Sequence, residues 1–464
     1  MNSSKKINGE DMQKLWEYLF NEDTGRGIAL TSLMYNSSYQ KTYNFVRQSQ
    51  WWSSEQIQKY QWQQLTALLH HAYEHVPYYT RLFKTQGITP NDIQSLQNFQ
   101  QLSFLTKEIV QEHTNEFKAT SYPAYTFEET STGGSTGFLL RFNVEKGVWF
   151  AKHLAYMKLL LERAECQSLD KSVQIIGREK PWEYRPLSRT LVLSSYQMTD
   201  QNLPRYIKKI RRLQPQYFIG YPSAITMLAT YMKHHSIELK EIKAIFCFGE
   251  TIYDWQREFL EKFFQCRVHG QYGHREQCVL AGTCEKSNSY HIFPDYGFVE
   301  LIDRNGQPVT QDGESGEIVA TGFHTGIFPF IRYKTGDIAI YSTHHCECGR
   351  NYQLFKSIEG RAQDFMVSKT KRLVPLMGVL QLIAKSSPNM KEYQLYQDCE
   401  GEIVLHIVKN EGFSEDDERC IRENFQKRLG DEFSLFFTYV DSIRRTNRGK
   451  YQFLIQKLTI QFSP

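Results

Sequence analysis

The 464-residue sequence predicts an α/β protein with a large N-terminal domain and a small α+β C-terminal domain. In the large domain we expect mixed or parallel sheets flanked by helices, together with a separate β region. Three observations support this expectation. The length exceeds the size at which a single hydrophobic core usually keeps growing. Apolar strands alternate with helical patterns between residues 172 and 273. Short strands separated by hairpin-type dipeptides follow between residues 290 and 340.

Residues 10–115 are expected to be largely helical. Apolar residues recur at three- and four-residue spacing over 63–75, and Pro77 is predicted to end that helix, because the residue before a proline disfavours the helical region. Thr89-Pro90 is predicted to start another helix. A further helix with apolar spacing is expected over 145–165.

The middle of the chain carries the alternating pattern. Strands are expected at 172–177, 189–194, 216–223, 242–249 and 267–273, with helices running to about residue 235 and over 252–264. Ligands of such sheets bind outside the carboxyl ends of the strands. We therefore expect a site near the turns at Gly220, Gly249 and Gly273.

The β region is expected to be antiparallel. Its strands are predicted at 298–303, 316–321 and 337–341, and Asn305-Gly306 and Asp312-Gly313 supply the turns. After Arg361 comes a segment of about 100 residues with strand and helix signals of its own. The predicted domains are therefore residues 1–361 and residues 362–464.

Composition excludes some function classes. Hydrophobic residues make up 41% of the chain and charged residues 23%, which is typical of a globular protein. The net charge of +4 is too small to argue for nucleic acid or an anionic membrane. No apolar run is long enough for a transmembrane helix, and the polar N-terminus lacks the pattern of a signal peptide. Nine irregularly spaced cysteines indicate reduced thiols in a cytoplasmic protein. The oligomeric state stays open, with a homodimer among the options.

Seven consecutive residues, Ser131-Thr132-Gly133-Gly134-Ser135-Thr136-Gly137, are small or hydroxylated. Such a loop lets backbone N–H groups and hydroxyls close around phosphate oxygens. No lysine follows the glycines, so the loop differs from the P-loop of many nucleotide-binding proteins. A flexible turn is the alternative interpretation.

Five motifs follow one another along the chain, and their order is informative. They are Ser131–Gly137, Phe248-Gly-Glu250, Tyr272-Gly-His-Arg-Glu276, Arg332-Tyr-Lys-Thr-Gly-Asp337, and Gly360-Arg361 followed by Lys450. In this order the sequence resembles the adenylate-forming enzymes. His71–Tyr79 and Leu102–Lys107 look like the phenylacetate–CoA ligase family. Trp51–Ser54 and Ser131–Gly137 look more like its capsular-polysaccharide branch. The resemblance covers roughly residues 50 to 455.

The resemblance implies that ATP activates a carboxylic acid and that the acyl group then passes from the adenylate to an acceptor. It also implies a mobile C-terminal domain. The implied contacts are the Ser131–Gly137 loop with phosphates, Glu276 with Mg²⁺, Asp337 with the ribose hydroxyls, Arg361 with ribose and phosphate, Gly249 and Glu250 with adenine, Tyr272 and Tyr221 with the acyl pocket, and Lys450 with the carboxylate and α-phosphate. Glu276 and Lys450 are the implied catalytic residues.

Each assignment has a plainer alternative. Asp337 could be a turn residue, Lys450 a surface cation, and Glu250 an ordinary acid at a helix N-terminus. The sequence also departs from the family pattern. Phe138 replaces a lysine after the loop, and Arg275 stands where a small hydroxyl residue is usual. The hinge of the family falls near Gln363.

Two Cys/His pairs flank the β region. Cys284 and His291 precede it, and Cys346 and Cys348 follow it, with Gly349 permitting a tight turn. Three thiolates and an imidazole suit a closed tetrahedral Zn²⁺ site. Buried thiols without a metal and a redox pair are the alternatives.

The leading hypothesis is an ATP-dependent ligase that forms an acyl-adenylate. Coenzyme A is the acceptor that the resemblance implies, and an amine or hydroxyl in capsule or O-antigen polysaccharide biosynthesis is a second option. The alternative is a non-catalytic or sugar-binding relative in envelope polysaccharide assembly. Binding of nucleic acid would need a concentrated basic face, which the sequence does not predict.

Overall fold

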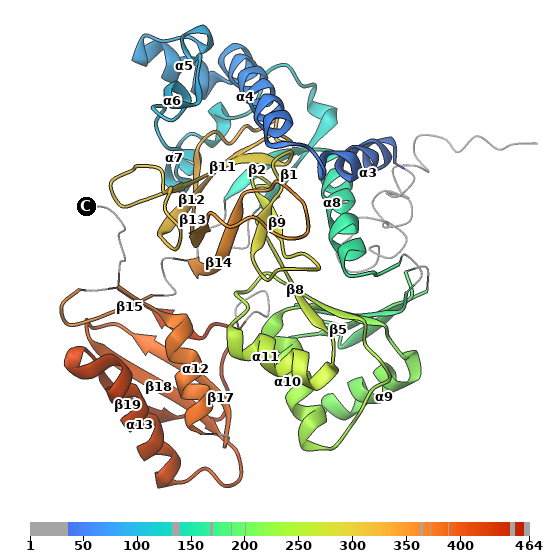
Figure 1. The fold of residues 1–464 in the computed structure, drawn as a ribbon, viewed down its shortest axis with the longest axis vertical. Helices are drawn as coiled ribbons and strands as arrows, with labels where there is room; N and C mark the ends of the chain where they lie inside the picture. Colours follow the sequence, from blue (N-terminus) through green and yellow to red (C-terminus); the bar gives the residue numbers. More distant parts are fainter. Residues whose placement is uncertain are drawn as a thin grey trace, which may run out of the picture.

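A computed structural model describes residues 36–458, apart from residues 132–139, 168–169, 187, 200, 362–364, 372, 388 and 446–450. Figure 1 shows a large body that holds the N-terminal helices and a long mixed sheet. A smaller unit at the lower left holds the C-terminal strands and helices. The predicted α/β class is confirmed.

The long sheet has twelve strands within the described residues, in the order β11-β12-β13-β14-β10-β9-β8-β7-β6-β3-β5-β4. Strands β5, β3, β6, β7 and β8 are parallel, whereas every pairing from β8 through to β11 is antiparallel. The bounds are β3 (Ser172–Ile176), β4 (Trp182–Arg185), β5 (Thr190–Ser194), β6 (Tyr217–Gly220), β7 (Ala244–Phe248), β8 (Arg267–Gly273), β9 (Leu280–Gly282), β10 (Tyr290–Ile292), β11 (Gly297–Ile302), β12 (Ser315–Gly322), β13 (Tyr333–Ser342) and β14 (Leu354–Arg361).

The predicted strands of both regions are therefore present, but the separate β region is not separate. It continues the parallel sheet through β9 and β10, which have three residues each. Strands this short carry too little alternation for a sequence pattern to reveal them. The edge strand β4, antiparallel to β5, was also not predicted.

Helices cover the parallel part of the sheet. Buried apolar residues of α9 (Leu203–Leu213), α10 (Pro222–His234) and α11 (Asp254–Phe264) share one core with β3, β5, β6, β7 and β8. The helix predicted over 145–165 is shorter, because α8 spans Trp149–Arg163. Glu145 instead ends β2 (Arg141–Glu145), which pairs with β1 (Phe127–Ser131), and Gly147 turns the chain with a φ of +71°.

The N-terminal helices pack against the antiparallel part of the sheet. They are α4 (Ser54–His75), α5 (Pro77–Gln86), α6 (Leu96–Phe99) and α7 (Lys107–Glu112), whereas α3 (Ser37–Ser49) packs against α8. Their apolar side chains, chiefly from α4 onward, share a core with β11, β12, β13 and β14. Pro77 does end α4, but it also begins α5, because proline is well suited to the first helical position. At Pro90 only a short 3₁₀ turn forms.

The C-terminal unit has a four-stranded sheet in the order β19-β18-β17-β20. Its elements are β15 (Phe365–Val367), β16 (Leu373–Pro375), α12 (Leu376–Ser386), β17 (Met390–Gln397), β18 (Glu402–Lys409), α13 (Glu415–Leu429), β19 (Ser434–Tyr439) and β20 (Leu454–Gln456). The unit has its own apolar core, and Tyr253 of the large body is buried in that core. The two units therefore meet beside α11, as Figure 1 shows.

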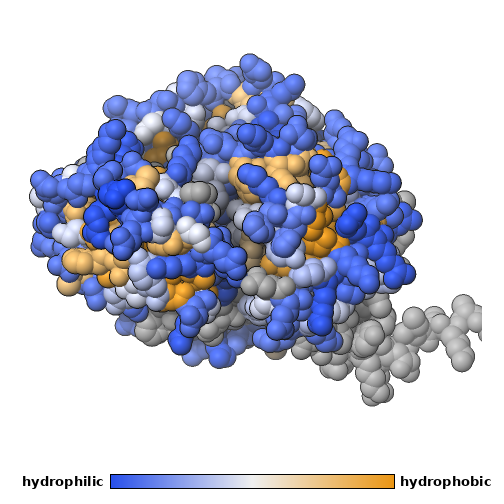
Figure 2. All heavy atoms as spheres, turned by 90° about the horizontal axis from the view of Figure 1, so that it is seen from below, coloured by the Kyte–Doolittle hydropathy of each residue, from blue (hydrophilic) through white to orange (hydrophobic). Residues whose placement is uncertain are grey.

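The surface seen from below is mostly hydrophilic, with separate hydrophobic patches (Figure 2). Among the described helices, none combines the length and apolar character that crossing a membrane requires.

Candidate active site and metal centre

The expected strand-end turns are formed at two neighbouring parallel strands. Gly220 ends β6, and a Cβ there would lie 2.4 Å from the carbonyl oxygen of Ile175, so only glycine fits. Gly249 follows β7 with a φ of +76°, in the left-handed region that glycine favours. These turns lie at the carboxyl edge of the sheet, where ligands of α/β proteins bind.

Two carboxylates are each held by a tyrosine from the other's segment. The Tyr272 hydroxyl at the end of β8 donates to Asp337 Oδ2 on β13, at 2.7 Å. In return, the Tyr333 hydroxyl of β13 donates to Glu276 Oε1, just after β8, at 3.1 Å. This reciprocal pair joins two motifs that are about 60 residues apart in the chain. It therefore places two predicted site carboxylates, Glu276 and Asp337, beside each other's motif.

Glu276 is buried and yet ionised. Burial alone would raise its pKa, but the charge of His274 and hydrogen bonds from His274 and Tyr333 outweigh that effect, so the pKa is lowered. The His274 Nδ1 atom lies 3.0 Å from Glu276 Oε2. Burial, followed by the charge of Glu276, raises the pKa of Tyr333, which keeps its hydroxyl protonated as a donor. Each carboxylate oxygen of Glu276 retains a further lone pair, as a Mg²⁺ ligand requires.

Arg275, the residue that departs from the family pattern, turns toward the start of the predicted phosphate loop. Its Nε and Nη2 atoms donate to Thr130 Oγ1 on β1, at 3.2 and 3.1 Å. Its guanidinium lies over the ring of Trp149, 4.9 Å from the centroid. The large side chain thus ties the end of β1, next to Ser131, to the motif that holds Glu276. Sequence reasoning identified Arg275 as unusual but could not say where it points.

The structure describes only some of the other residues that were predicted to form the nucleotide site. Asp337 faces Arg361 in the register of β13 and β14, although the side chain of Arg361 is not described. Ser131 ends β1. The loop residues Thr132, Gly133, Gly134, Ser135, Thr136 and Gly137, the hinge residue Gln363 and the proposed catalytic Lys450 lie outside the described residues.

Among the described residues, Glu250 accepts hydrogen bonds from the backbone N–H groups of Ser223 and Tyr451. Its Oε2 atom accepts from Ser223 N, in the first turn of α10, at 3.1 Å. Its Oε1 atom accepts from Tyr451 N, in the C-terminal unit, at 2.9 Å. Glu250 was also predicted to be an ordinary acid at a helix N-terminus. It does contact such an N-terminus, but that of α10, which precedes it in the chain, and not that of α11, which follows it. Tyr221, expected at the acyl pocket, is buried with its ring 5.7 Å from that of Phe248.

The four predicted metal ligands come together. The ligand atoms of Cys284, His291, Cys346 and Cys348 all lie within 4.8 Å of one another. Cys284 Sγ is 3.5 Å from Cys346 Sγ, and Cys348 Sγ is 3.3 Å from His291 Nε2. Zn–S and Zn–N bonds of about 2.3 and 2.0 Å in a tetrahedron would separate ligand atoms by roughly 3.5 to 3.8 Å. The donor set therefore fits a closed Zn²⁺ site.

Neighbouring groups orient these ligands. His291 Nδ1 lies 3.1 Å from the carbonyl oxygen of Ser289, which leaves Nε2 toward the thiols. Cys284 Sγ accepts from the backbone N–H groups of Lys286 and Ser287, at 3.3 and 3.2 Å. Burial lowers the pKa of His291 to about 4, so its imidazole is neutral at pH 7. The pair Cys284/His291 belongs to the β9–β10 segment, whereas Cys346/Cys348 follows β13, so only the folded sheet brings the pairs together.

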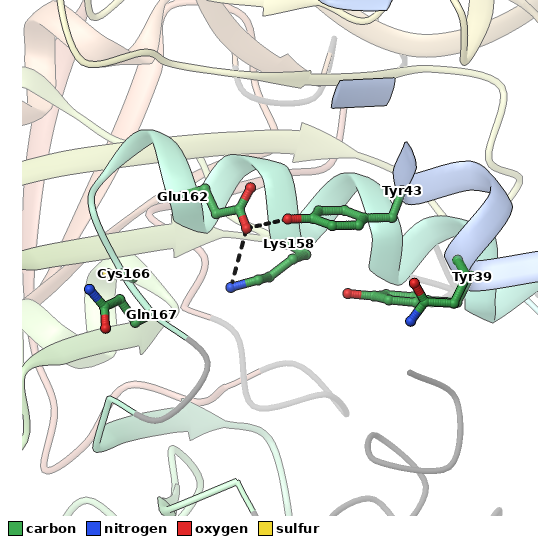
Figure 3. Close-up of a pocket in the computed structure, with 7 residues that line it drawn as sticks. Tyr39, Tyr43, Lys158, Glu162, Cys166 and Gln167 are labelled. Carbon is green, nitrogen blue, oxygen red and sulfur yellow. Dashed lines mark hydrogen bonds and ion pairs between the residues drawn. The ribbon is translucent and has the colours of Figure 1, made fainter. Parts of the chain in front are cut away.

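A separate cavity of about 430 Å³ lies between α3 and α8 (Figure 3). The Tyr43 hydroxyl donates to Glu162 at 2.5 Å, and Lys158 Nζ lies 3.5 Å from the same carboxylate. Burial, and then Glu162, raise the pKa of Tyr43 to about 12, so it remains a donor. Tyr43 and Lys158 both bond to Glu162, and none of the residues that line this cavity belongs to the motifs of Glu276 and Asp337, where we place the candidate active site.

Comparison with solved structures shows which proteins share this fold. The 2-hydroxyisobutyryl-CoA ligase in its postadenylation state, in complex with 2-HIB-AMP, superposes with a TM-score of 0.70 at 18% identity, over 85% of this chain and 88% of that one. The same ligase in its thioesterification state gives a TM-score of 0.58. The chain therefore has the fold of adenylate-forming ligases.

Comparison of sequences shows to which proteins with this fold the chain is homologous. Residues 366–457 match the family model of the CapK C-terminal domain. Protein CapK of Staphylococcus aureus is 27% identical over 396 residues, covering 82% of this chain and 85% of the relative. The phenylacetate-coenzyme A ligase of Thermus thermophilus is 24% identical, with the same two coverages. The chain is thus a homologue of Protein CapK and of the phenylacetate–CoA ligases, with the fold of the adenylate-forming ligases.

Proposed function

We propose that this protein activates a carboxylic acid with ATP and transfers the acyl group to an acceptor. In the first step a carboxylate oxygen attacks the α-phosphorus of ATP, and pyrophosphate leaves. In the second step the acceptor attacks the acyl carbon, and AMP leaves with the bonding electron pair. The acceptor loses its proton to solvent or to a base.

The reciprocal hydrogen bonding of Tyr272 with Asp337 and of Tyr333 with Glu276 carries this proposal. It supports two carboxylates near the end of β8 and on β13 with different tasks. Asp337 would accept hydrogen bonds from the ribose hydroxyls, since a carboxylate is an acceptor only. Glu276 would hold Mg²⁺, which neutralises charge on the phosphates. The proposed roles of Lys450, Arg361 and the Ser131–Gly137 loop follow from resemblance, with 1–361 and 362–464 as the proposed domains.

The acceptor that we favour is the thiol of coenzyme A. The chain is homologous to proteins named phenylacetate-coenzyme A ligase, and four such relatives match it. The homology to Protein CapK supports a second candidate acceptor, an amine or hydroxyl of a polysaccharide precursor. The proposed role of the Cys284/His291/Cys346/Cys348 cluster is to bind a structural Zn²⁺ that joins β9–β10 to the segment after β13.

An ATP–pyrophosphate exchange screen tests the proposal. Aryl, fatty and amino acids would be offered singly with Mg²⁺, and incorporation of labelled pyrophosphate into ATP would be measured. Exchange with at least one acid supports the ligase, whereas omission of the acid provides the blank. If zinc-loaded, correctly folded protein gives no exchange with any acid, the non-catalytic or sugar-binding alternative takes its place. Coenzyme A, amines and sugars would then be compared as acceptors for the acid that is active.

A further inference from the structure

We infer that Glu250 is a positioning residue that docks the C-terminal unit for the adenylation step, by accepting a hydrogen bond from the backbone N–H of Tyr451. The inference rests on the proposed function for what docking achieves, and on the geometry of Glu250 for how docking occurs. It assigns to Glu250 a task in place of the adenine contact that the resemblance implied.

The first observation is the bridge itself. The carboxylate of Glu250 accepts from Ser223 N at 3.1 Å and from Tyr451 N at 2.9 Å. Ser223 lies in the first turn of α10, where backbone N–H groups lack helical partners and favour a negative charge. One carboxylate thus joins the N-terminus of a helix in the large body to the backbone of the C-terminal unit. Hydrogen bonds to an ionised acceptor are about twice as strong as neutral ones.

The second observation is an aromatic contact beside the bridge. The ring of Phe453 packs edge-on against Tyr253, with centroids 5.2 Å apart, and against Trp255 at 6.4 Å. Tyr253 and Trp255 follow Glu250 directly, just before and within α11. Two residues after the bridged amide, the chain therefore makes a second contact with the same short segment of the large body.

The third observation is that Tyr451 is rigidly held within its own unit. Its hydroxyl accepts from Tyr393 N at 3.1 Å and also donates to the carbonyl of Tyr393. The guanidinium of Arg445 lies 4.1 Å from the centroid of the Tyr451 ring, and Arg445 pairs with Glu392 at 2.5 Å. Fixing the amide of Tyr451 therefore fixes the unit that surrounds it.

The consequence concerns the adjacent residue in the sequence. Lys450, the proposed catalytic lysine, shares a peptide bond with Tyr451, so the hydrogen bond to Glu250 involves the amide that links the two residues. Adenylation needs this docking, whereas acyl transfer in a protein with a mobile C-terminal unit does not. Loss of the Glu250 carboxylate should therefore affect the first step selectively.

The first measurement needs no substrate. Hydrogen–deuterium exchange of the full chain would be compared for wild type, Glu250→Ala, Glu250→Gln and Glu258→Ala. Glu258 is an exposed acid on α11 and serves as the matched control. In Glu250→Ala we expect faster exchange in peptides that begin several residues before Tyr451 and include its amide, and in those containing Trp255, with the other C-terminal peptides unchanged. Unchanged exchange at Tyr451 would overturn the inference. Glu250→Gln, which keeps one acceptor oxygen, separates loss of the bond from misfolding.

The second measurement separates the half-reactions, with an acid that supports exchange in wild type. We expect Glu250→Ala to lower the kcat of ATP–pyrophosphate exchange by about 10- to 100-fold, as the loss of one charge-assisted hydrogen bond allows. The KM for ATP should change by less than about 3-fold, and transfer from a synthetic acyl-adenylate should stay near the wild-type rate. Phe453→Ala should give the same selective pattern.

An equal loss in both half-reactions, or a rise in the KM for ATP alone, would overturn the inference and restore a simple adenine-binding role. Absence of exchange in wild type with every acid would instead refute the proposed function. The hydrogen–deuterium measurement would still decide whether Glu250 docks the unit, so the two failures are distinguishable.

Discussion

Removing the hydroxyl of Tyr272 should weaken ATP binding, because that hydroxyl orients Asp337. The bond of 2.7 Å reaches a carboxylate on half-buried strand β13. Hydrogen bonds to charged groups contribute about 1.5–3 kcal/mol, which corresponds to an upper limit of roughly 10- to 150-fold in affinity. We expect Tyr272→Phe to bind ATP at least about 5-fold more weakly than wild type, because an Asp337 carboxylate without this hydrogen bond must be ordered when the ribose binds.

The assay is isothermal titration calorimetry with a non-hydrolysable ATP analogue and Mg²⁺, which requires no knowledge of the acid. Tyr341→Phe is the matched control, because it lies on the same strand and the described residues offer its hydroxyl no hydrogen bond. A double-mutant cycle with Asp337→Asn should give a coupling energy of about 0.5–3 kcal/mol. If Tyr272→Phe binds the analogue as tightly as wild type, Asp337 either needs no orientation or does not contact the nucleotide, and our reasoning about this site is wrong.

Four further predictions concern catalysis, metal and stability. Lys450→Ala should reduce pyrophosphate release by about 10²–10³-fold, as removal of one electrostatic catalyst does, and near-wild-type release would remove that role. Gently purified protein should contain about one zinc per chain by mass spectrometry, and Cys348→Ser should lower both the zinc content and the melting temperature; zinc well below one per chain in wild type would refute the site. Arg332 is 2% exposed and pairs with Glu300 at 3.0 Å, so Arg332→Met should lower the free energy of unfolding in urea by about 3–5 kcal/mol, because it leaves a buried unpaired charge; an unchanged midpoint would contradict this. Burial raises the pKa of Asp295 to about 6, above an unfolded value of about 3.9, so the native state binds more protons between these two pH values. The free energy of unfolding should therefore fall by up to about 3 kcal/mol as the pH rises from 4 through 6. Asp295→Asn should lack this part of the pH dependence in urea titrations, and an identical pH dependence in the variant would refute the prediction.

Much of the fold could be predicted because it depends on local patterns. The parallel strands are short apolar runs that end in glycine turns, as at Gly220 and Gly249, and the helices between them have clear apolar spacing. The hairpin dipeptides correctly indicated an antiparallel region. Predictions were less accurate where a strand was too short to show a pattern, or where tertiary contacts overrode the local preference of the sequence. Strands β9 and β10 join the two regions with three residues each, and Glu145 pairs in β2 although its surroundings favour a helix.

The candidate site divides in the same way. Glu276 and Asp337 were predicted from motifs, but Tyr333 was not singled out, since one tyrosine among 28 gives no signal of its own. The orientation of Arg275 toward Thr130 and Trp149 could not be predicted either, because Thr130 lies 145 residues away in the chain. Glu250 was expected to act on adenine, and its bond to Tyr451 could not be foreseen from residues 200 positions apart.

By itself, the sequence determined the α/β class and the identity of the four metal-binding candidates, because residue types, spacing and short-range periodicity encode these. Its resemblance to a known family implied the candidate chemistry. Only the tertiary structure decided which distant groups meet: the reciprocal tyrosine–carboxylate bonds, the Cys/His cluster and the Glu250 bridge. The physical reason is that strand order and helix packing set these separations, and both arise from burial of apolar surface over the whole chain and not from any local stretch.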